Sequence, residues 1–133
     1  MPVAVVEVLE PVDIDHEDTD RHGHAIGDQV LRAVGGAIMA AVRDDDVPAR
    51  YGGEEFVVLL RNPSREVAVD VGERVRGAVG ALDLDEYGVA GVSVSVGVAV
   101  ASVPDQPIEA LVAEADRALY RAKRAGRDRV VAA

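Results

Sequence analysis

The sequence predicts a single α/β domain with a mixed, largely antiparallel sheet flanked by helices. Two observations predict it: runs of β-branched residues alternate with segments of helical periodicity, and a glycine pair separates two strand-like runs. No repeat or linker interrupts the order strand, helix, strand, strand, helix, strand, helix, strand. That alternation excludes a sandwich or a helix bundle, and 133 residues fit one core, so we expect one domain over 1–133.

The first strand and the first helix are separated by a polar segment. Residues 3–9, VAVVEVL, are rich in β-branched side chains and end before Pro11, as a buried strand does. The segment DIDHEDTDRHGH that follows is too polar to be buried and is expected to be a surface loop. Residues 25–42 then carry apolar side chains on one helix face. These are Ile26, Val30, Leu31, Val34, Ile38 and Val42.

A hairpin is expected where Pro48 discourages continuation of the first helix. The run YGGEEFVVLL predicts strand, turn and strand, because Gly52 and Gly53 permit backbone angles that β-branched residues avoid. Ser64 is a suitable N-cap for a second helix. Its apolar face consists of valines spaced by four residues: Val67, Val71, Val75 and Val79.

The last third of the chain predicts a strand, a helix and a short final strand. Residues 91–100, GVSVSVGVAV, alternate as strands do, and Pro104 to Pro107 close them. Residues 107–125 form a helix that Gly126 stops, and 128–131 add a short strand. The apolar face of this helix is Ile108, Leu111, Val112, Ala115, Ala118, Leu119 and Ala122.

Composition excludes several classes of function. A net charge of −10 opposes general attraction to nucleic acid or anionic lipid, and 3% aromatic residues offer little surface for base stacking. The chain has no cysteine, which excludes disulfides and thiolate metal sites. No apolar stretch approaches the roughly 20 residues of a membrane span. We therefore expect a cytoplasmic protein without membrane insertion.

Residues 51–56, YGGEEF, resemble the signature of the GGDEF family of diguanylate cyclases in its Glu-containing form. Three further segments match in order: GHAIGD at 23–28, SVSVGVA at 93–99 and ADRALYRAKRAGRDRV at 115–130. We expect the helical segment that normally precedes the first strand in this family to be absent. The resemblance implies a palm-like fold in which two domains face each other, each holding one GTP. It implies metal-assisted formation of cyclic di-GMP with Mg²⁺ or Mn²⁺.

The resemblance assigns roles to the hairpin residues. Glu54 would be the metal-binding carboxylate, with Glu55 beside it as a polar contact in the catalytic site. Gly52 and Gly53 would let the backbone approach the nucleotide. The alternative is a solvated turn that carries two ordinary acids.

Three residues on helices would contact the nucleotide. Asp28 matches the residue that accepts hydrogen bonds from guanine; alternatively it is an acid in the first turn of a helix. Lys123 and Arg127 match the pair that contacts the terminal phosphates. Four residues apart at a helix end, they can face one anion. Alternatively, they compensate the helix dipole.

Arg43 and Asp46 form RxxD at the distance before GGEEF where the family places its product-inhibition site. Arg43 would pair with cyclic di-GMP, Asp46 would fix Arg43 or accept from the base, and Arg74 would be a third member. The alternative is an ordinary helix end.

The first catalytic loop departs from the family pattern, and two alignments remain open. With two residues deleted, Asp13 is the first metal ligand and Ile14 offers its carbonyl. With none deleted, Pro11 stands at the metal position, Asp13 takes the second acidic place and His16 replaces the usual Lys. Thr19 replaces the guanine-reading Asn in both alignments, which weakens base discrimination.

Histidines at 16, 22 and 24 also lie among acids in or beside this loop. Their spacing does not suit joint ligation on a helix, so a solvated acidic loop is favoured over a zinc site.

Three functions follow from these patterns. The first is a diguanylate cyclase that acts as a homodimer. The second is a degenerate domain that binds GTP or cyclic di-GMP and signals to a partner, and the third is a scaffold without ligands. The resemblance also implies a sensory or regulatory partner.

Overall fold

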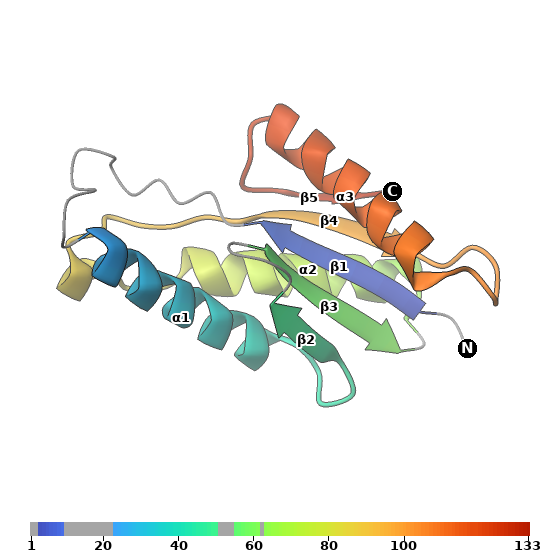
Figure 1. Ribbon diagram of the computed structural model, residues 1–133, viewed down its shortest axis with the longest axis horizontal. Coiled ribbons are helices and arrows are strands. Elements are labelled where there is room, and N and C mark those ends of the chain that lie inside the picture. The colour runs from blue at the N-terminus through green and yellow to red at the C-terminus, as the bar shows by residue number, and fades with distance from the viewer. Residues whose placement is uncertain (1–2, 10–22, 51–54, 62) are drawn as a thin grey trace.

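The computed structural model describes residues 3–9, 23–50, 55–61 and 63–133. The predicted order of strands and helices is confirmed, with one additional short 3₁₀ helix (Figure 1). The elements are β1 (Val3–Leu9), α1 (Gly23–Ala41), β2 (Val47–Arg50), β3 (Glu55–Arg61), α2 (Arg65–Gly80), η2 (Asp85–Tyr87), β4 (Ser95–Val100), α3 (Ile108–Arg124) and β5 (Val130–Ala132).

The five strands form one mixed sheet in the order β2-β3-β1-β4-β5. The first three neighbouring pairs are antiparallel, and β5 pairs in parallel with β4. The central strand β1 sets a shared register, in which Leu9 lies opposite Glu55 of β3 on one side and Ser95 of β4 on the other. The starts of β3 and β4 therefore lie at the same end of the sheet.

Two strands differ from the expected ranges. The hairpin prediction placed its first strand around Tyr51, whereas β2 ends at Arg50 and includes Pro48. Proline is tolerated there because β2 is an edge strand that pairs only with β3. The alternating run was expected to form a strand from residue 91, yet β4 begins at Ser95 and its first five residues are all buried. Helices cover both faces of β4, so alternation in the sequence did not mean one solvated face.

Helices α1 and α2 close one face of the sheet with the larger apolar core. The buried residues there are Val30, Val34, Ile38, Val58, Leu60, Ala68, Val71, Val75, Val79, Leu84, Val94, Val96 and Val98. Ser64 caps α2 as predicted, because its hydroxyl oxygen accepts a hydrogen bond from the Val67 amide at 3.1 Å. The predicted valine face of α2 is confirmed at Val71, Val75 and Val79, which are fully buried.

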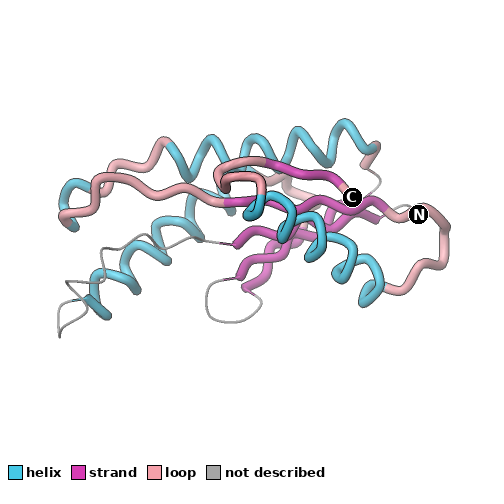
Figure 2. The backbone as a smooth tube through the Cα atoms, turned by 90° about the horizontal axis from the view of Figure 1, so that it is seen from above, coloured by secondary structure: helices cyan, strands magenta, loops and turns pink. Residues whose placement is uncertain are grey.

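Helix α3 covers the opposite face, so α2 and α3 lie on opposite sides of the sheet (Figure 2). Its small core contains Val57, Ala99, Leu111 and Ala115. Ile108 was expected on the buried face but is 50% exposed. It is the first residue of α3 and lies outside this core, so helical periodicity overestimated its burial.

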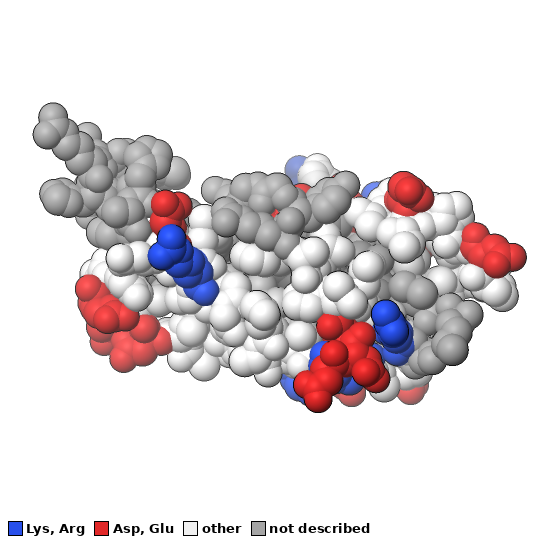
Figure 3. Space-filling model, turned by 60° about the horizontal axis from the view of Figure 1, so that its bottom comes forward, with Lys and Arg blue, Asp and Glu red and all other residues white. Residues whose placement is uncertain are grey.

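The surface around α1 and β2 is largely uncharged in the view of Figure 3, where acidic and basic side chains gather in a few small groups. Met39 of α1 and Val47 of β2 are among the exposed large apolar residues. Among the described helices, none has both the length and the apolar character needed to cross a bilayer.

Candidate functional site

Glu55 connects the YGGEEF segment to the rest of the sheet. As the first residue of β3 it lies on the same face as Val57, the face that α3 covers. The carboxyl group is half-buried, and burial raises its pKa above the usual value. The negative charge of Asp116 raises this pKa further, whereas the positive charge of Lys123 lowers it. Glu55 is therefore within electrostatic reach of an acid and a base on α3.

Asp116 and Lys123 both belong to α3 and are seven residues apart. Because an α-helix has 3.6 residues per turn, this spacing places them on the same side of the helix, two turns apart. The charges of this carboxylate and this ammonium group both act on Glu55 at the start of β3. Glu55 is also the last residue of the YGGEE segment.

Gly97 of β4 allows α3 to lie so close to the sheet. A Cβ atom at this position would overlap the carbonyl oxygen of Ala115 and the amide nitrogen of Leu119, and would lie 2.9 Å from the Leu119 Cα atom. Any side chain would push the helix away from the strand. Gly97 therefore fixes the height of Asp116 and Lys123 above the sheet.

The end of α3 determines where Arg127 lies. The Arg127 amide donates to the carbonyl of Ala122 at 2.9 Å, and the Gly126 amide donates to the carbonyl of Lys123 at 3.3 Å. These two hydrogen bonds form a Schellman motif, in which Gly126 adopts a φ of 125°. Arg127 follows in the left-handed region and is exposed. The turn, and not a continuous helix face as expected from the spacing, sets its position relative to Lys123.

Asp28 lies on α1, whose first residue is Gly23. The first turn of this helix contains no acid, so the alternative in which Asp28 stabilises the helix through the dipole is wrong. The side chain is exposed to solvent. Its carboxylate is therefore accessible to a ligand.

The RxxD segment forms a clamp between α1 and β2. Both carboxylate oxygens of Asp46 accept from the Arg43 side chain, at 3.2 Å from Nε and 3.0 Å from Nη2, and Oδ2 also accepts from the Arg43 amide at 2.8 Å. The Asp46 side chain is fully buried, whereas that of Arg43 is 36% exposed. The hydrogen bonds to Asp46 raise the pKa of Arg43. Asp46 thus holds Arg43 in one orientation.

Arg74, the third residue expected at this site, is exposed on α2. It lines a surface hollow of about 550 Å³ with Val67, Asp70 and Glu73. Within the described part of the chain, no hydrogen bond or ion pair joins Arg74 to the RxxD pair. The structure therefore supports a fixed Arg43–Asp46 pair, and the membership of Arg74 stays a prediction.

Comparison of the sequence with protein-family models identifies the family of this domain. The model described as the GGDEF domain of diguanylate cyclases matches residues 12–129, which is most of the chain. The chain belongs to the GGDEF domain family. The resemblance stated from four sequence segments is therefore confirmed.

Curated relatives of this GGDEF domain are named as diguanylate cyclases. It is 40% identical over 122 residues to diguanylate cyclase A of Treponema denticola, covering 90% of this chain and 33% of that protein. It is 42% identical over 126 residues to diguanylate cyclase DgcP of Pseudomonas aeruginosa, covering 92% of this chain and 19% of that protein. The chain thus spans a third or less of the length of these two relatives.

Solved GGDEF structures share the fold. The active GGEEF domain of a diguanylate cyclase from Vibrio cholerae superposes with a TM-score of 0.85 at 28% identity, covering 99% of this chain and 83% of that one. The GGDEF domain of DgcB from Caulobacter crescentus, solved with cyclic di-GMP, gives 0.82 at 30% identity, with coverages of 98% and 77%. The palm-like fold expected from the sequence is confirmed.

Several predicted site residues of this GGDEF domain lie outside the described residues. They are Asp13, Ile14, Thr19, Gly52, Gly53 and Glu54. The two alignments of the first loop, which also involve Pro11 and His16, likewise stay predictions. Within the described ranges, no group of three or more His, Asp or Glu side chains is arranged to hold a metal ion.

Sequence reasoning overlooked Asp116 and Ser95. Asp116 carried a signal, since it precedes Lys123 by seven residues within the ADRALYRAK segment. Ser95 is 1% exposed, and its Oγ atom has no hydrogen-bond partner among the described residues. Ser95 and Glu55 both lie opposite Leu9, so this buried hydroxyl lies at the same end of the sheet as the acid. Its sequence signal was only a polar residue within a strand.

Proposed function

We propose that this GGDEF domain is a diguanylate cyclase, which condenses two GTP molecules into cyclic di-GMP and releases one pyrophosphate from each. The observation that carries the proposal is that α3 covers the face of the sheet on which Glu55 lies, where the charge of Lys123 lowers the pKa of Glu55. An acid and a base from separate motifs of the family then border one site. The names of the relatives support the same activity.

Lys123 and Arg127 are proposed to bind the terminal phosphates of GTP. In each transfer, the 3′ hydroxyl of one nucleotide attacks the α-phosphorus of the other, and the bond to the departing pyrophosphate breaks. Negative charge then builds up on the leaving group. Ammonium and guanidinium groups placed next to it stabilise that charge through strong hydrogen bonds.

The donors in and around the site fit a hard divalent cation. Glu55 has a raised pKa because burial and Asp116 disfavour its ionised form, and a bound cation would offset that unfavourable potential. We propose that Asp13, Glu54 and the carbonyl of Ile14 hold Mg²⁺ or Mn²⁺. When bound, this ion supplies Lewis-acid stabilisation of the phosphate oxygens.

Guanine would be read by Asp28, whose exposed carboxylate can accept hydrogen bonds from the base, together with Thr19. Gly52 and Gly53 would let the hairpin backbone approach the phosphates. Because Thr19 has a single hydroxyl where an amide could both donate and accept, we expect weaker discrimination between GTP and ATP than an Asn would give.

A homodimer is proposed for catalysis, since two bound nucleotides must attack each other. We further propose a cytoplasmic domain that responds to a sensory or regulatory partner. The absence of cysteine suits that compartment.

The Arg43–Asp46 pair, with Arg74, is proposed to bind cyclic di-GMP as an inhibitor. Two side-chain hydrogen bonds to Asp46 already hold the Arg43 guanidinium. Less conformational entropy is therefore lost when this group binds the product. Replacing Arg43 by Ala is expected to raise the concentration of cyclic di-GMP needed for inhibition and to leave the uninhibited rate unchanged. Inhibition equal to that of the wild type would contradict this assignment.

The proposal is tested by measuring cyclic di-GMP formation from GTP by chromatography over a range of protein concentrations. Glu54→Ala is expected to abolish turnover, and Lys123→Ala to reduce it by about 100-fold, the usual effect of losing one charge-stabilising donor. Arg124→Ala is the matched control for Lys123→Ala. Arg124 is the next residue on α3 and lies over the Tyr120 ring instead of next to Glu55.

A folded wild-type protein that makes no cyclic di-GMP at any concentration would refute the cyclase proposal. Calorimetry with GTP and with cyclic di-GMP then distinguishes the remaining functions. Binding without turnover would identify a regulatory binding module, and the absence of binding to both nucleotides would leave the scaffold.

A further inference from the structure

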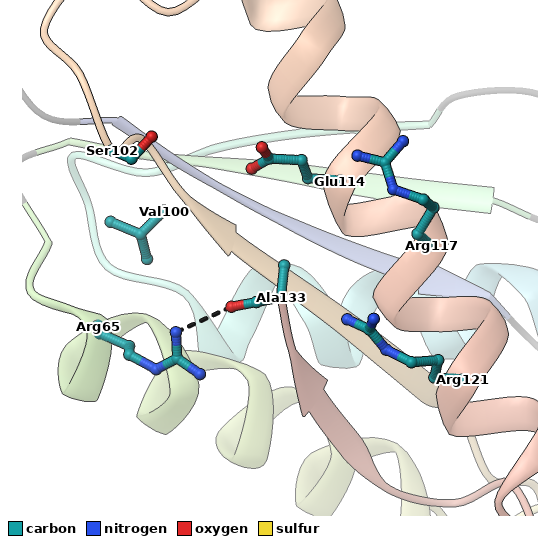
Figure 4. A pocket seen from close by; sticks show the side chains of 7 residues that line it. All are labelled: Arg65, Val100, Ser102, Glu114, Arg117, Arg121 and Ala133. Atoms are coloured by element: carbon teal, nitrogen blue, oxygen red, sulfur yellow. Dashed lines mark hydrogen bonds between the residues drawn. The ribbon is translucent and has the colours of Figure 1, made fainter.

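A second surface hollow, lined by three arginines, lies between α2, α3 and the end of β5, away from Glu55. It measures about 420 Å³, and Figure 4 shows its lining residues. Arg65 of α2 and Arg121 of α3 point toward each other from opposite sides of Ala133, and Arg117 is one turn before Arg121. The lining consists of Arg65, Val100, Ser102, Glu114, Arg117, Arg121 and Ala133.

The charge of this hollow is opposite to that of the chain. Three guanidinium groups and the Glu114 carboxylate line it, and in the 133-residue chain the α-carboxylate of Ala133 adds a second negative charge; the hollow stays net positive, although the whole chain has a net charge of −10. Arg117 and Arg121 are spaced by four residues on one helix, an arrangement in which like charges repel each other. An anion between the two walls would relieve this repulsion.

The arginines of α3 differ in their partners. Arg124 lies over the Tyr120 ring, with its Cζ atom 5.8 Å from the ring centroid. In contrast, no ion pair joins Arg117 or Arg121 to any carboxylate in the described part of the chain, including Glu114. Arg65 donates from Nη1 to the main-chain carbonyl of Ala133 at 2.8 Å, which orients its guanidinium at the edge of the hollow. The guanidinium groups of Arg117 and Arg121, which have no ion-pair partner among the described residues, are suited to phosphate oxygens.

The hollow is separate from the proposed GTP site. Arg117 and Arg121 are displaced by about 120° around the axis of α3 from Asp116 and Lys123, given 3.6 residues per turn. None of the residues that line the hollow was assigned to GTP, metal or cyclic di-GMP.

We propose that this hollow binds a diphosphate group, either as free pyrophosphate or as part of a nucleoside diphosphate. Cations on two walls, on α2 and α3, favour an anion with several charged oxygens over a single carboxylate. The volume falls within the range of small-molecule sites. Glu114 opposes the anion, so it limits the affinity. This inference does not depend on cyclase activity.

Binding is tested by titrating the ¹⁵N-labelled 133-residue chain with inorganic pyrophosphate and with GDP, at constant ionic strength. Signals of the Arg117 and Arg121 side chains and of the Ser102 amide are expected to shift, and sodium chloride should not shift them. The variant Lys123→Gln/Arg127→Gln is expected to keep these shifts. Equal affinities for the two ligands would identify the diphosphate itself as the recognised group, whereas tighter GDP binding would identify a nucleotide.

Substitutions of residues that line the hollow are expected to change its affinity for pyrophosphate in two opposite directions. Arg117→Gln/Arg121→Gln is expected to weaken binding by about 100-fold, about tenfold for each lost charge-assisted contact. Glu114→Gln is expected to strengthen binding several-fold, a gain that misfolding cannot produce. Arg124→Gln is the control and should bind as the wild type does. Shifts confined to Lys123 and Arg127, or unchanged affinity in the double arginine variant, would overturn the proposal.

Discussion

The two faces of the sheet are built differently. Helices α1 and α2 cover one face with a core in which fully buried valines predominate. Helix α3 covers the other face with a smaller cluster among the described residues, Val57, Ala99, Leu111 and Ala115. It also buries Ala118, Leu119 and Ala122, and it approaches the sheet at Gly97. Glu55 and Ser95 lie at one end of this second face. The polar groups of the candidate site thus lie at one end of the face whose apolar cluster is the smaller of the two.

This difference indicates a division between stability and function. Burying methyl groups provides most of the stability of a domain, and the α1/α2 face has more of them. Keeping a half-buried carboxylate near another acid costs stability, and that cost is confined to the α3 face. Variants of each face therefore test whether the two roles are separable.

The largest effect is expected from Gly97→Ala. The new methyl group overlaps the backbone of α3, which cannot move aside as a flexible side chain would, so we expect a loss of about 3 kcal/mol in the free energy of unfolding. The displaced helix should also weaken GTP binding. Gly77→Ala is the control, since nothing lies within 4 Å of its new methyl group. It should stabilise α2 by up to about 1 kcal/mol. Urea unfolding measures both, and equal effects would contradict the close packing.

A smaller loss is expected from Val75→Ala on the α1/α2 face. Val75 is fully buried on α2, and removing its two methyl groups should cost about 2 kcal/mol through lost burial and a residual cavity. GTP affinity, measured by calorimetry at a temperature where the variant is folded, should stay unchanged. A large fall in affinity would show that this face contributes directly to the site.

The effect of Glu55→Gln is expected to depend on pH. The pKa of Glu55 is raised in the folded protein, so its ionised carboxylate destabilises the fold above that pKa, and the penalty disappears as the pH falls through it. The variant should be more stable than the wild type at neutral pH and equal to it in acid. Thermal unfolding across a pH series measures the difference. A variant that is less stable at neutral pH would show that Glu55 makes a compensating contact.

The smallest effect is expected from Arg76→Gln, which removes a link between the faces. Arg76 of α2 pairs with Glu73 at 2.9 Å and with Asp128, in the turn after α3, at 3.3 Å. All three side chains are at least one-third exposed, so the loss should stay below about 0.5 kcal/mol and vanish at high salt. A loss several times larger would show that the turn carrying Arg127 depends on this contact.

The sequence predicted the α1/α2 face better than the α3 face. Valines at four-residue spacing and the Ser64 cap are local signals, and both appear in the structure as expected. The first helix ends before Pro48, as predicted, but only the structure shows that Pro48 lies within β2, an edge strand that tolerates proline. The burial of both faces of β4 and the exposure of Ile108 depend on which helices cover each element. Local periodicity does not contain that information.

The sequence by itself determined the family, the order of the elements and the identity of the candidate site residues, because motifs, caps and apolar periodicity are properties of short segments. Only the tertiary structure decided that Asp116 lies near Glu55, that Gly97 sets the height of α3, and that Arg65 and Arg121 line one hollow at the end of β5. These neighbours are between 18 and 61 residues apart in the chain. Their proximity follows from strand register and helix packing, which join segments that no local pattern connects.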